Sequence, residues 1–171
     1  TGTGNFFNCS THGYGDGSQY LLIGKYVKVI TDGTLFNYTN SVNSNIPVAI
    51  YGDVTCRAIA HISGFGTGKI VTFTINPKRL KLTGDTFITC GTYPETSQML
   101  VNITGGTLVL PSSANSVDYW NNSKASAYTI TVSGGVFNNV GSALSGYIPS
   151  THALSELAID GATYAYVSEK T

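Results

Sequence analysis

The sequence predicts an all-β protein built as a single domain over residues 1–171, and three observations support this prediction. Thr, Ser, Asn and Gly together supply 72 of the 171 residues, a composition that favours strands and turns over helices. Short segments rich in β-branched and aromatic residues recur along the chain between Gly, Asn, Asp or Pro. A loose pattern around glycine also repeats at intervals typical of a β-solenoid.

The expected strands follow one another from near the N-terminus to near the C-terminus. They cover residues 20–30, 47–56, 70–75, 86–90, 99–104, 107–110, 128–132 and 163–167. One short helix is predicted over residues 152–158, because Ser150 and Thr151 can cap its start and Asp160 and Gly161 can end it.

The repeat consists of an apolar residue, a hydroxyl residue, Gly, a small residue, a β-branched residue and an apolar residue. It is clearest at residues 82–87, 103–108 and 132–137, and looser copies begin at positions 30, 62 and 159. This pattern predicts a parallel β-helix-like solenoid over at least residues 82–167, with each coil about 4.8 Å above the last. Turns of an antiparallel β-sandwich or jelly roll, as in a trimeric fibre head, match the same pattern and are the alternative.

Charge and cysteine usage exclude several classes of function. Nine basic and nine acidic residues cancel, so no field steers the chain toward nucleic acid. No apolar stretch approaches the roughly 20 residues that a spanning helix needs, so membrane insertion is not expected. Cys9, Cys56 and Cys90 have no metal-ligand spacing. A Cys56–Cys90 bridge or buried free thiols would both fit, and no metal or other cofactor is predicted.

The first residue is Thr1 rather than Met, so we expect a processed chain or a piece of a longer protein.

No catalytic residue is predicted. No Gly-x-Ser-x-Gly segment occurs, and the three histidines stand apart from one another in the sequence. His61 and Ser63 alternate onto one strand face with Asp53 nearby in sequence, but an ordinary structural role for His61 is the simpler interpretation. Two or three carboxylates brought together would suffice for a glycosidase or lyase. Most aspartates here lie beside glycine, where Asp commonly shapes a turn.

The best candidate binding segment lies between two expected strands. Exposed aromatic rings and planar polar groups are what a sugar-binding surface needs. The predicted contact residues of this loop are Asp118, Tyr119, Trp120, Asn121 and Asn122. Tyr14, Tyr38 and Tyr93 are weaker candidates of the same kind. Alternatively, Trp120 anchors the loop to the core or packs against a neighbouring subunit.

Residues 128–138, together with Gly146-Tyr147 and residues 161–167, resemble the last coils of bacterial surface β-helix proteins, which repeat a Ser-Gly-Gly-Thr-Phe motif. The low charge and the richness in Gly, Thr, Ser and Asn are also similar to phage tail fibres and tailspikes. Both resemblances cover mainly residues 82–167. Tail fibres and tailspikes are usually homotrimers that bind glycans on the host surface.

These resemblances imply a non-enzymatic recognition module located outside the cell or on a virion surface. It would bind a cell-surface glycan or protein of the host as a homotrimer, without nucleic acid as a partner. One alternative is a structural subunit of a bacterial or archaeal surface filament or adhesin, whose exposed strand edges are completed by the next subunit. Another is a polysaccharide lyase or glycosidase on a β-helix.

Overall fold

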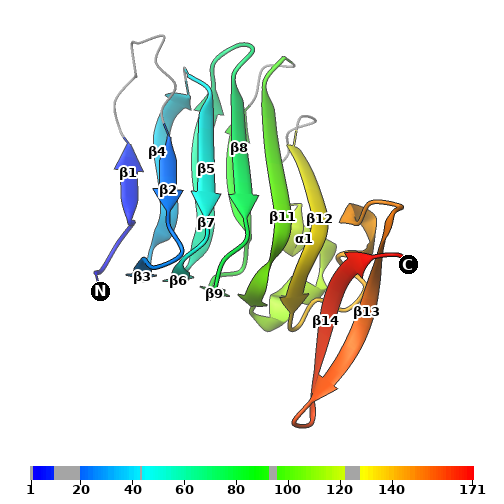
Figure 1. Cartoon of the computed structure of the whole chain (residues 1–171). Helices are drawn as coiled ribbons and strands as arrows, with labels where there is room; N and C mark the ends of the chain where they lie inside the picture. Colours follow the sequence, from blue (N-terminus) through cyan, green and yellow to red (C-terminus); the bar gives the residue numbers. More distant parts are fainter. Residues whose placement is uncertain (1, 10–19, 43, 93–95, 122–127) are drawn as a thin grey trace.

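The computed structural model describes residues 2–9, 20–42, 44–92, 96–121 and 128–171. These residues form a β-solenoid of about four turns, followed by a hairpin (Figure 1). Strands of successive coils pair in parallel throughout the solenoid, and the antiparallel pairs of the described residues are confined to the terminal hairpin and its junction. The predicted all-β, β-helix-like fold is therefore confirmed, and the solenoid also includes coils that precede residue 82. The predicted range of 82–167 was wrong at its C-terminal end, because the last solenoid strand ends at residue 137 and residues 152–167 belong to the hairpin.

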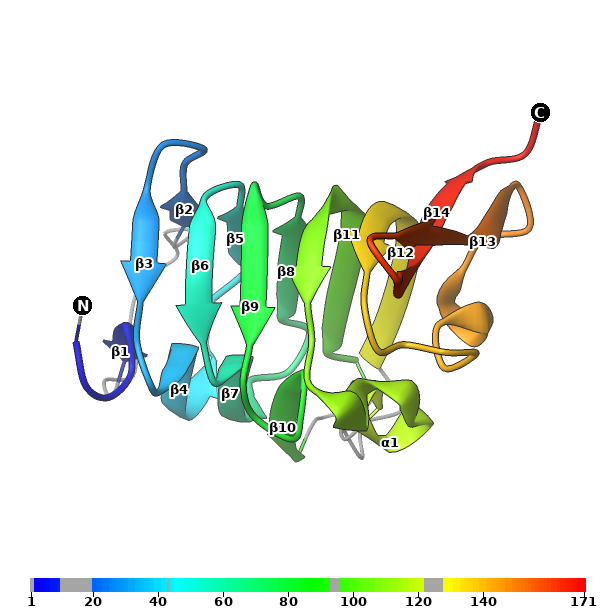
Figure 2. The same cartoon turned by 90° about the horizontal axis from the view of Figure 1, so that it is seen from below.

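The first four coils present strands on three faces. The first face is a four-stranded sheet of β1 (Phe7–Cys9), β4 (Thr34–Val42), β7 (Ala58–Phe65) and β10 (Ile88–Thr92). The second face holds β2 (Leu21–Ile23), β5 (Ile46–Ile50), β8 (Ile70–Ile75) and the first halves of β11 (Gln98–Val109) and β12 (Tyr128–Phe137). The third face, seen in Figure 2, holds β3 (Lys28–Ile30), β6 (Asp53–Cys56), β9 (Arg79–Leu82) and the second halves of β11 and β12.

The strand register gives the true length of a coil. Along the second face, isoleucines at 23, 50, 75 and 103 and the valine at 132 pair in succession, so the coils are 27, 25, 28 and 29 residues long. All five side chains are at most 2% exposed and form a continuous inward ladder. Stacking like apolar residues on successive coils buries one core along the whole solenoid.

The segments that match the predicted repeat do not occupy equivalent positions in successive coils. The segments 103–108 and 132–137 do lie one above the other, at the corner between the second and third faces. The segments that begin at 30 and 82 instead lie at the corner before the first face, and the segment at 62 lies inside β7. The starts at positions 30, 62, 82 and 103 are 32, 20 and 21 residues apart, and these intervals are not coil lengths, because the matching segments occupy different positions within the coils.

The predicted helix over residues 152–158 was wrong. Those residues belong to β13 (His152–Ile159), which pairs residue by residue with β14 (Ala162–Glu169) in an antiparallel hairpin. Asp160 and Gly161 join the strands, with φ angles of 50° and 78°. Two successive residues with positive φ form the turn that matches the twist of a hairpin, so Asp-Gly here connects strands rather than ending a helix.

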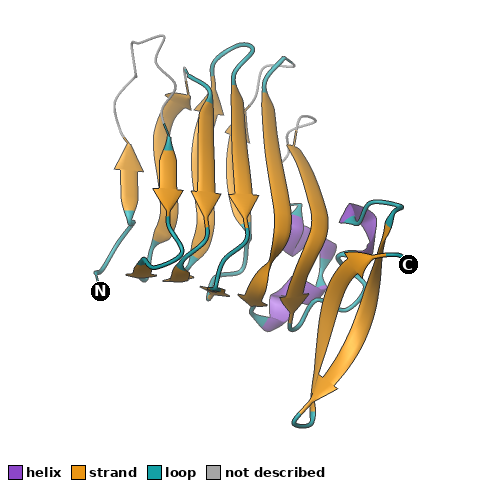
Figure 3. Ribbon diagram, in the orientation of Figure 1, coloured by secondary structure: helices purple, strands orange, loops and turns teal. Residues whose placement is uncertain are grey.

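Three short helical segments lie near the C-terminal coils (Figure 3). They are the 3₁₀ segments η1 (Ser112–Asn115) and η2 (Ser145–Tyr147), and α1 (Val117–Trp120). None of the helices in the described ranges has the length and apolar character that a membrane crossing requires. Val140, Ala143 and Leu144, in the loop after β12, are buried and cover the core at that end.

Candidate functional site

The solenoid departs from its regular course after β11. Between the third and first faces, one earlier coil needs only Arg57 between β6 and β7. After β11 the chain instead forms an insertion, residues 110–121, that contains η1 and α1. The Oγ of Ser116 accepts a hydrogen bond of 3.3 Å from the backbone N–H of Asp118 and so caps α1. An ordered insertion on a rigid scaffold is a common place for a binding site.

Aromatic packing attaches this insertion to the coil before it. Trp120 is fully buried, and its Nε1 donates a 2.9 Å hydrogen bond to the carbonyl of Ala114. Its ring centroid lies 4.8 Å from that of Phe87. The backbone N–H of Phe87 donates to the carbonyl of Tyr119 at 3.0 Å. In the structure Trp120 anchors the insertion to the core. Its ring has no exposed face on which a sugar could stack, so the prediction of a sugar contact at Trp120 was wrong.

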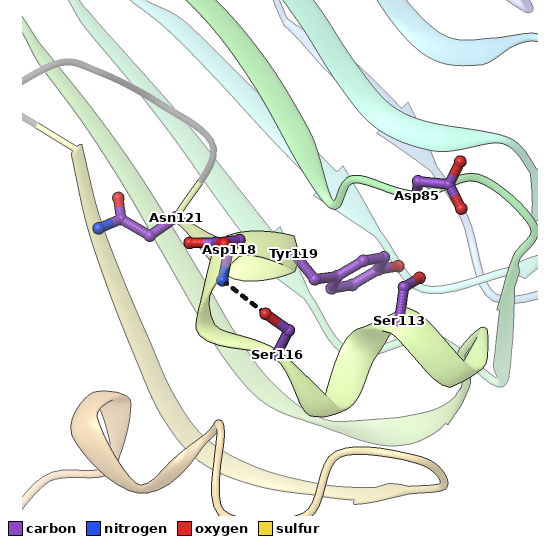
Figure 4. Close-up of a pocket in the computed structure, with 6 residues that line it drawn as sticks. All are labelled: Asp85, Ser113, Ser116, Asp118, Tyr119 and Asn121. Carbon is purple, nitrogen blue, oxygen red and sulfur yellow. Dashed lines mark hydrogen bonds between the residues drawn. The ribbon is translucent and has the colours of Figure 1, made fainter.

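A polar pocket lies where the insertion meets the preceding coil (Figure 4). Its volume is about 340 Å³, and it is lined by Asp85, Ser113, Ser116, Asp118, Tyr119 and Asn121. Asp85 comes from the corner between β9 and β10, one coil earlier than the other five residues. Figure 4 shows the Tyr119 hydroxyl turned toward Ser113 and Asp85, with Asp118 and Asn121 at the other end of the ring.

Two buried hydroxyl groups of this pocket have no hydrogen-bond partner in the described structure. They belong to Ser113 and Tyr119, and the Tyr119 side chain is 1% exposed. Burial raises the pKa of the Tyr119 phenol above its ordinary value, and the nearby Cys56 and Asp85 raise it further. The phenol is therefore protonated at neutral pH and can donate a hydrogen bond. Unpaired buried hydroxyls are costly, so these two groups indicate a place where a ligand could supply the missing partner.

The other predicted contact residues fall into two groups. Tyr38 is fully buried in β4, where its ring stacks at 6.1 Å on that of Phe36, so the prediction of a surface contact there was wrong. Its position on β4 places the ring in the core ladder of the first face. Tyr14, Tyr93 and Asn122 lie outside the described residues.

The histidine and serine considered for catalysis lie together, on a different face from Asp53. Ser63 Oγ and His61 Nε2 are 3.4 Å apart on β7. Asp53 lies on β6, in a different face, where its carboxylate is 3.9 Å from the guanidinium of Arg79. The structure thus places Asp53 on a different face of the solenoid from His61 and Ser63.

Exposed aromatic side chains gather on the first coil, β1 to β3, at positions other than those predicted from the sequence. Tyr26 is 90% exposed at the corner between β2 and β3, and Lys25 Nζ lies 4.9 Å from its ring centroid. Tyr20, Leu22 and Ile30 are exposed on the same coil. The signal that could have identified them is a tyrosine in a Gly-Lys-Tyr-Val turn between two short apolar segments.

Within the described ranges, no group of three or more His, Cys, Asp or Glu side chains could hold a metal ion. Cys56 and Cys90 are free thiols, so the alternative of a bridge between them is not realised. Burial raises the pKa of each thiol to about 12, which keeps both protonated and unreactive near neutrality.

Comparisons of the chain with models of known protein families, with curated proteins and with solved structures find no match.

Proposed function

We propose that this chain is a non-enzymatic recognition module that binds a glycan in the pocket between Asp85 and the insertion. The observation that carries the proposal is the pair of buried, unpartnered hydroxyls of Ser113 and Tyr119 beside two carboxylates and an amide. Sugar hydroxyls both donate and accept hydrogen bonds, which suits a wall of hydroxyl, carboxylate and amide groups. A volume of about 340 Å³ is within the usual range of small-ligand sites.

The surroundings of the two carboxylates favour binding over catalysis. A glycosidase needs one carboxyl group that stays protonated, which requires a desolvated position. Asp85 and Asp118 are both exposed, and therefore neither has that environment. An assay for released reducing ends on a panel of surface polysaccharides checks this point, and turnover would contradict the non-enzymatic proposal.

The proposal includes a location outside the cell or on a virion and assembly as a homotrimer. Three pockets on one particle would bind a repetitive glycan surface with higher avidity than one pocket. The scarcity of charge in the chain supports such an assembly, because neutral strand surfaces can approach without repulsion. Size-exclusion chromatography with light scattering tests the trimer directly.

A matched pair of variants tests the pocket. We expect wild-type protein to bind at least one glycan on an array, and Asn121→Ala to weaken that binding about tenfold by removing one hydrogen-bonding side chain. Asn115→Ala is the control, because Asn115 is exposed on the same insertion and does not line the pocket. Equal binding by both variants, or no glycan bound by the wild type, would contradict the proposal.

The strand edges favour a second candidate function, a subunit of a surface filament or adhesin. Among the described strands, β1 and β2 each lack a partner on the side away from the next coil, and on that side β3 has the backbone N–H of Gly2 bonded to the carbonyl of Ile30. Leu22 is 50% exposed on β2. An exposed apolar edge is a template for another strand, so this function predicts polymers that grow with protein concentration. Leu22→Lys should suppress them, and a constant mass at all concentrations excludes this candidate.

A further inference from the structure

We infer that the pocket binds a positively charged, hydroxyl-rich residue, an unacetylated amino sugar, in preference to a neutral or acidic sugar. This inference rests on the proposed function, because it specifies the ligand of the same pocket.

The charged residues of the described chain that line the pocket are of one sign. Asp85 and Asp118 contribute two carboxylates, and the described lining residues include no lysine, arginine or histidine. In the described part of the chain the ion pair that forms is Arg79 with Asp53, so no described basic side chain forms an ion pair with either pocket carboxylate. A ligand cation would be attracted here, and a ligand carboxylate would meet two like charges.

Arg57 is a basic residue that lies one coil before Asp85. Its Cγ and carbonyl lie so close to Gly84 that a Cβ added there would come within 2.7 Å of both. The stem of Arg57 is therefore placed beside the corner that carries Asp85, but the guanidinium forms no ion pair with Asp85 in the described structure. Arg57 is exposed, and among the described residues it forms no ion pair with either pocket carboxylate.

Charge alone does not define the ligand, because the wall also contains hydroxyl groups. Tyr119 is almost completely buried with its hydroxyl unpartnered, and the Ser113 hydroxyl beside it is in the same condition. A bare ammonium group donates hydrogen bonds but cannot accept them. A neighbouring ligand hydroxyl can accept from the Tyr119 phenol and donate to a carboxylate. The pocket thus matches a residue that carries an amine and hydroxyls together.

Acetylation of the sugar amine provides a sharp test, because it removes the positive charge and keeps the ring hydroxyls. Titration calorimetry at pH 6 would use four probes of equal length: glucosamine, N-acetylglucosamine, glucose and galacturonate tetramers. We expect the glucosamine tetramer to bind at least about tenfold more tightly than the other three. We also expect its affinity to fall as salt is raised.

Variants assign the preference to the pocket. Asp118→Asn should remove most of the tenfold preference, whereas Asp160→Asn, at an exposed aspartate in the hairpin turn, should keep it. Tyr119→Phe should weaken binding about fivefold or more without lowering the melting temperature, because it deletes a hydroxyl that has no partner in the protein. If Asp118→Asn fails to fold by circular dichroism, Asp85→Asn replaces it.

The outcomes separate the two proposals. Equal or tighter binding of the acetylated, neutral or acidic tetramer overturns the amino-sugar inference and leaves glycan recognition standing. A preference for glucosamine that survives Asp118→Asn, or Asp85→Asn where that variant replaces it, also overturns it, since the charge would then act elsewhere. Failure of all four probes, together with an empty glycan array, overturns recognition in this pocket and the inference with it.

Discussion

At the scale of single residues, a glycine at a solenoid corner can be compared with a glycine in the hairpin turn. Gly106 and Gly161 both have positive φ, at 86° and 78°. A Cβ on Gly106 would lie 2.2 Å from the carbonyl oxygen of Pro77, one coil earlier, whereas a Cβ on Gly161 would meet nothing within 4 Å. The two positions therefore share a backbone conformation and differ in the space around it.

This difference predicts unequal effects of the same substitution. Gly161→Ala should lower the free energy of unfolding by about 1 kcal/mol, the usual cost of a left-handed alanine. Gly106→Ala should cost about 3 kcal/mol or more, because the coil below must move as well. Urea unfolding of both variants measures the difference. Similar losses would show that the corner tolerates a shift of Pro77.

Trp120 gives a second prediction at this scale. Because the ring is fully buried and its Nε1 is hydrogen-bonded to Ala114, Trp120→Ala should lower the free energy of unfolding by about 3–5 kcal/mol. Tyr26→Ala is the control at an exposed aromatic position and should change it by less than about 0.5 kcal/mol. Thermal melts followed by circular dichroism compare the two. An unchanged free energy of unfolding in Trp120→Ala would contradict the buried position of this side chain.

At the scale of elements, the inward ladder of the second face gives the strands their stability. Ile75 is buried at the middle of the ladder, between Ile50 and Ile103, while Thr74 beside it is only partly buried. Ile75→Ala should lower the free energy of unfolding by about 2–5 kcal/mol, because it leaves a cavity under two coils. Thr74→Ala should change it by about 0.5 kcal/mol. Chemical denaturation tests both, and equal losses would contradict the ladder.

The same elements explain how much of the fold the sequence could predict. β8 was predicted with its observed ends, Ile70–Ile75, because its burial alternates strictly as an apolar-in strand requires. β4 and β7 were missed. In β4, Leu35, Phe36, Asn37 and Tyr38 are all buried, and in β7 residues 58–60 are buried in succession. Each of these strands follows a solenoid corner and buries adjacent residues. The alternation of buried and exposed residues, from which a strand is predicted, is therefore absent there.

The candidate site was predictable only in part, for a related reason. Asp118 and Asn121 were identified from the composition of their loop, and both line the pocket. Asp85 was interpreted as a turn residue, because nothing in the linear sequence places it opposite Asp118. The two meet only because one coil stacks on the next, and the length of that coil was not known from the repeat. The burial of Trp120 likewise depends on Phe87 in the preceding coil.

At the scale of the whole molecule, the buried ionisable groups of the described residues are thiols and phenols rather than carboxylates. Cys56 is fully buried in β6, and burial raises its pKa from 9.0 to about 12. Burial also raises the pKa of Tyr128 well above 10.0, with smaller increases from Tyr147, Cys90 and Tyr119. All of these groups are neutral in the folded state at pH 7. None of them couples stability to pH on the acid side of neutrality.

The sign of the pH effect follows from these directions. Above pH 9 the unfolded chain loses the Cys56 proton, while the folded chain keeps it up to about pH 12. Deprotonation therefore lowers the free energy of the unfolded state relative to the folded state. Stability should thus be independent of these groups below pH 9 and decline between pH 9 and 12. The largest slope from this one thiol is about 1.4 kcal/mol per pH unit.

Thermal melts at pH 7, 8, 9, 10 and 11 measure this effect. We expect a constant melting temperature up to about pH 9, the unperturbed pKa of the thiol, and a progressive fall above it. Cys56→Ala provides the control, because it removes one titrating group and should flatten the alkaline fall even if it lowers stability at pH 7. An unchanged alkaline slope in this variant would show that Cys56 ionises in the folded state as readily as in the unfolded chain, and would contradict its placement in the dry core between the coils.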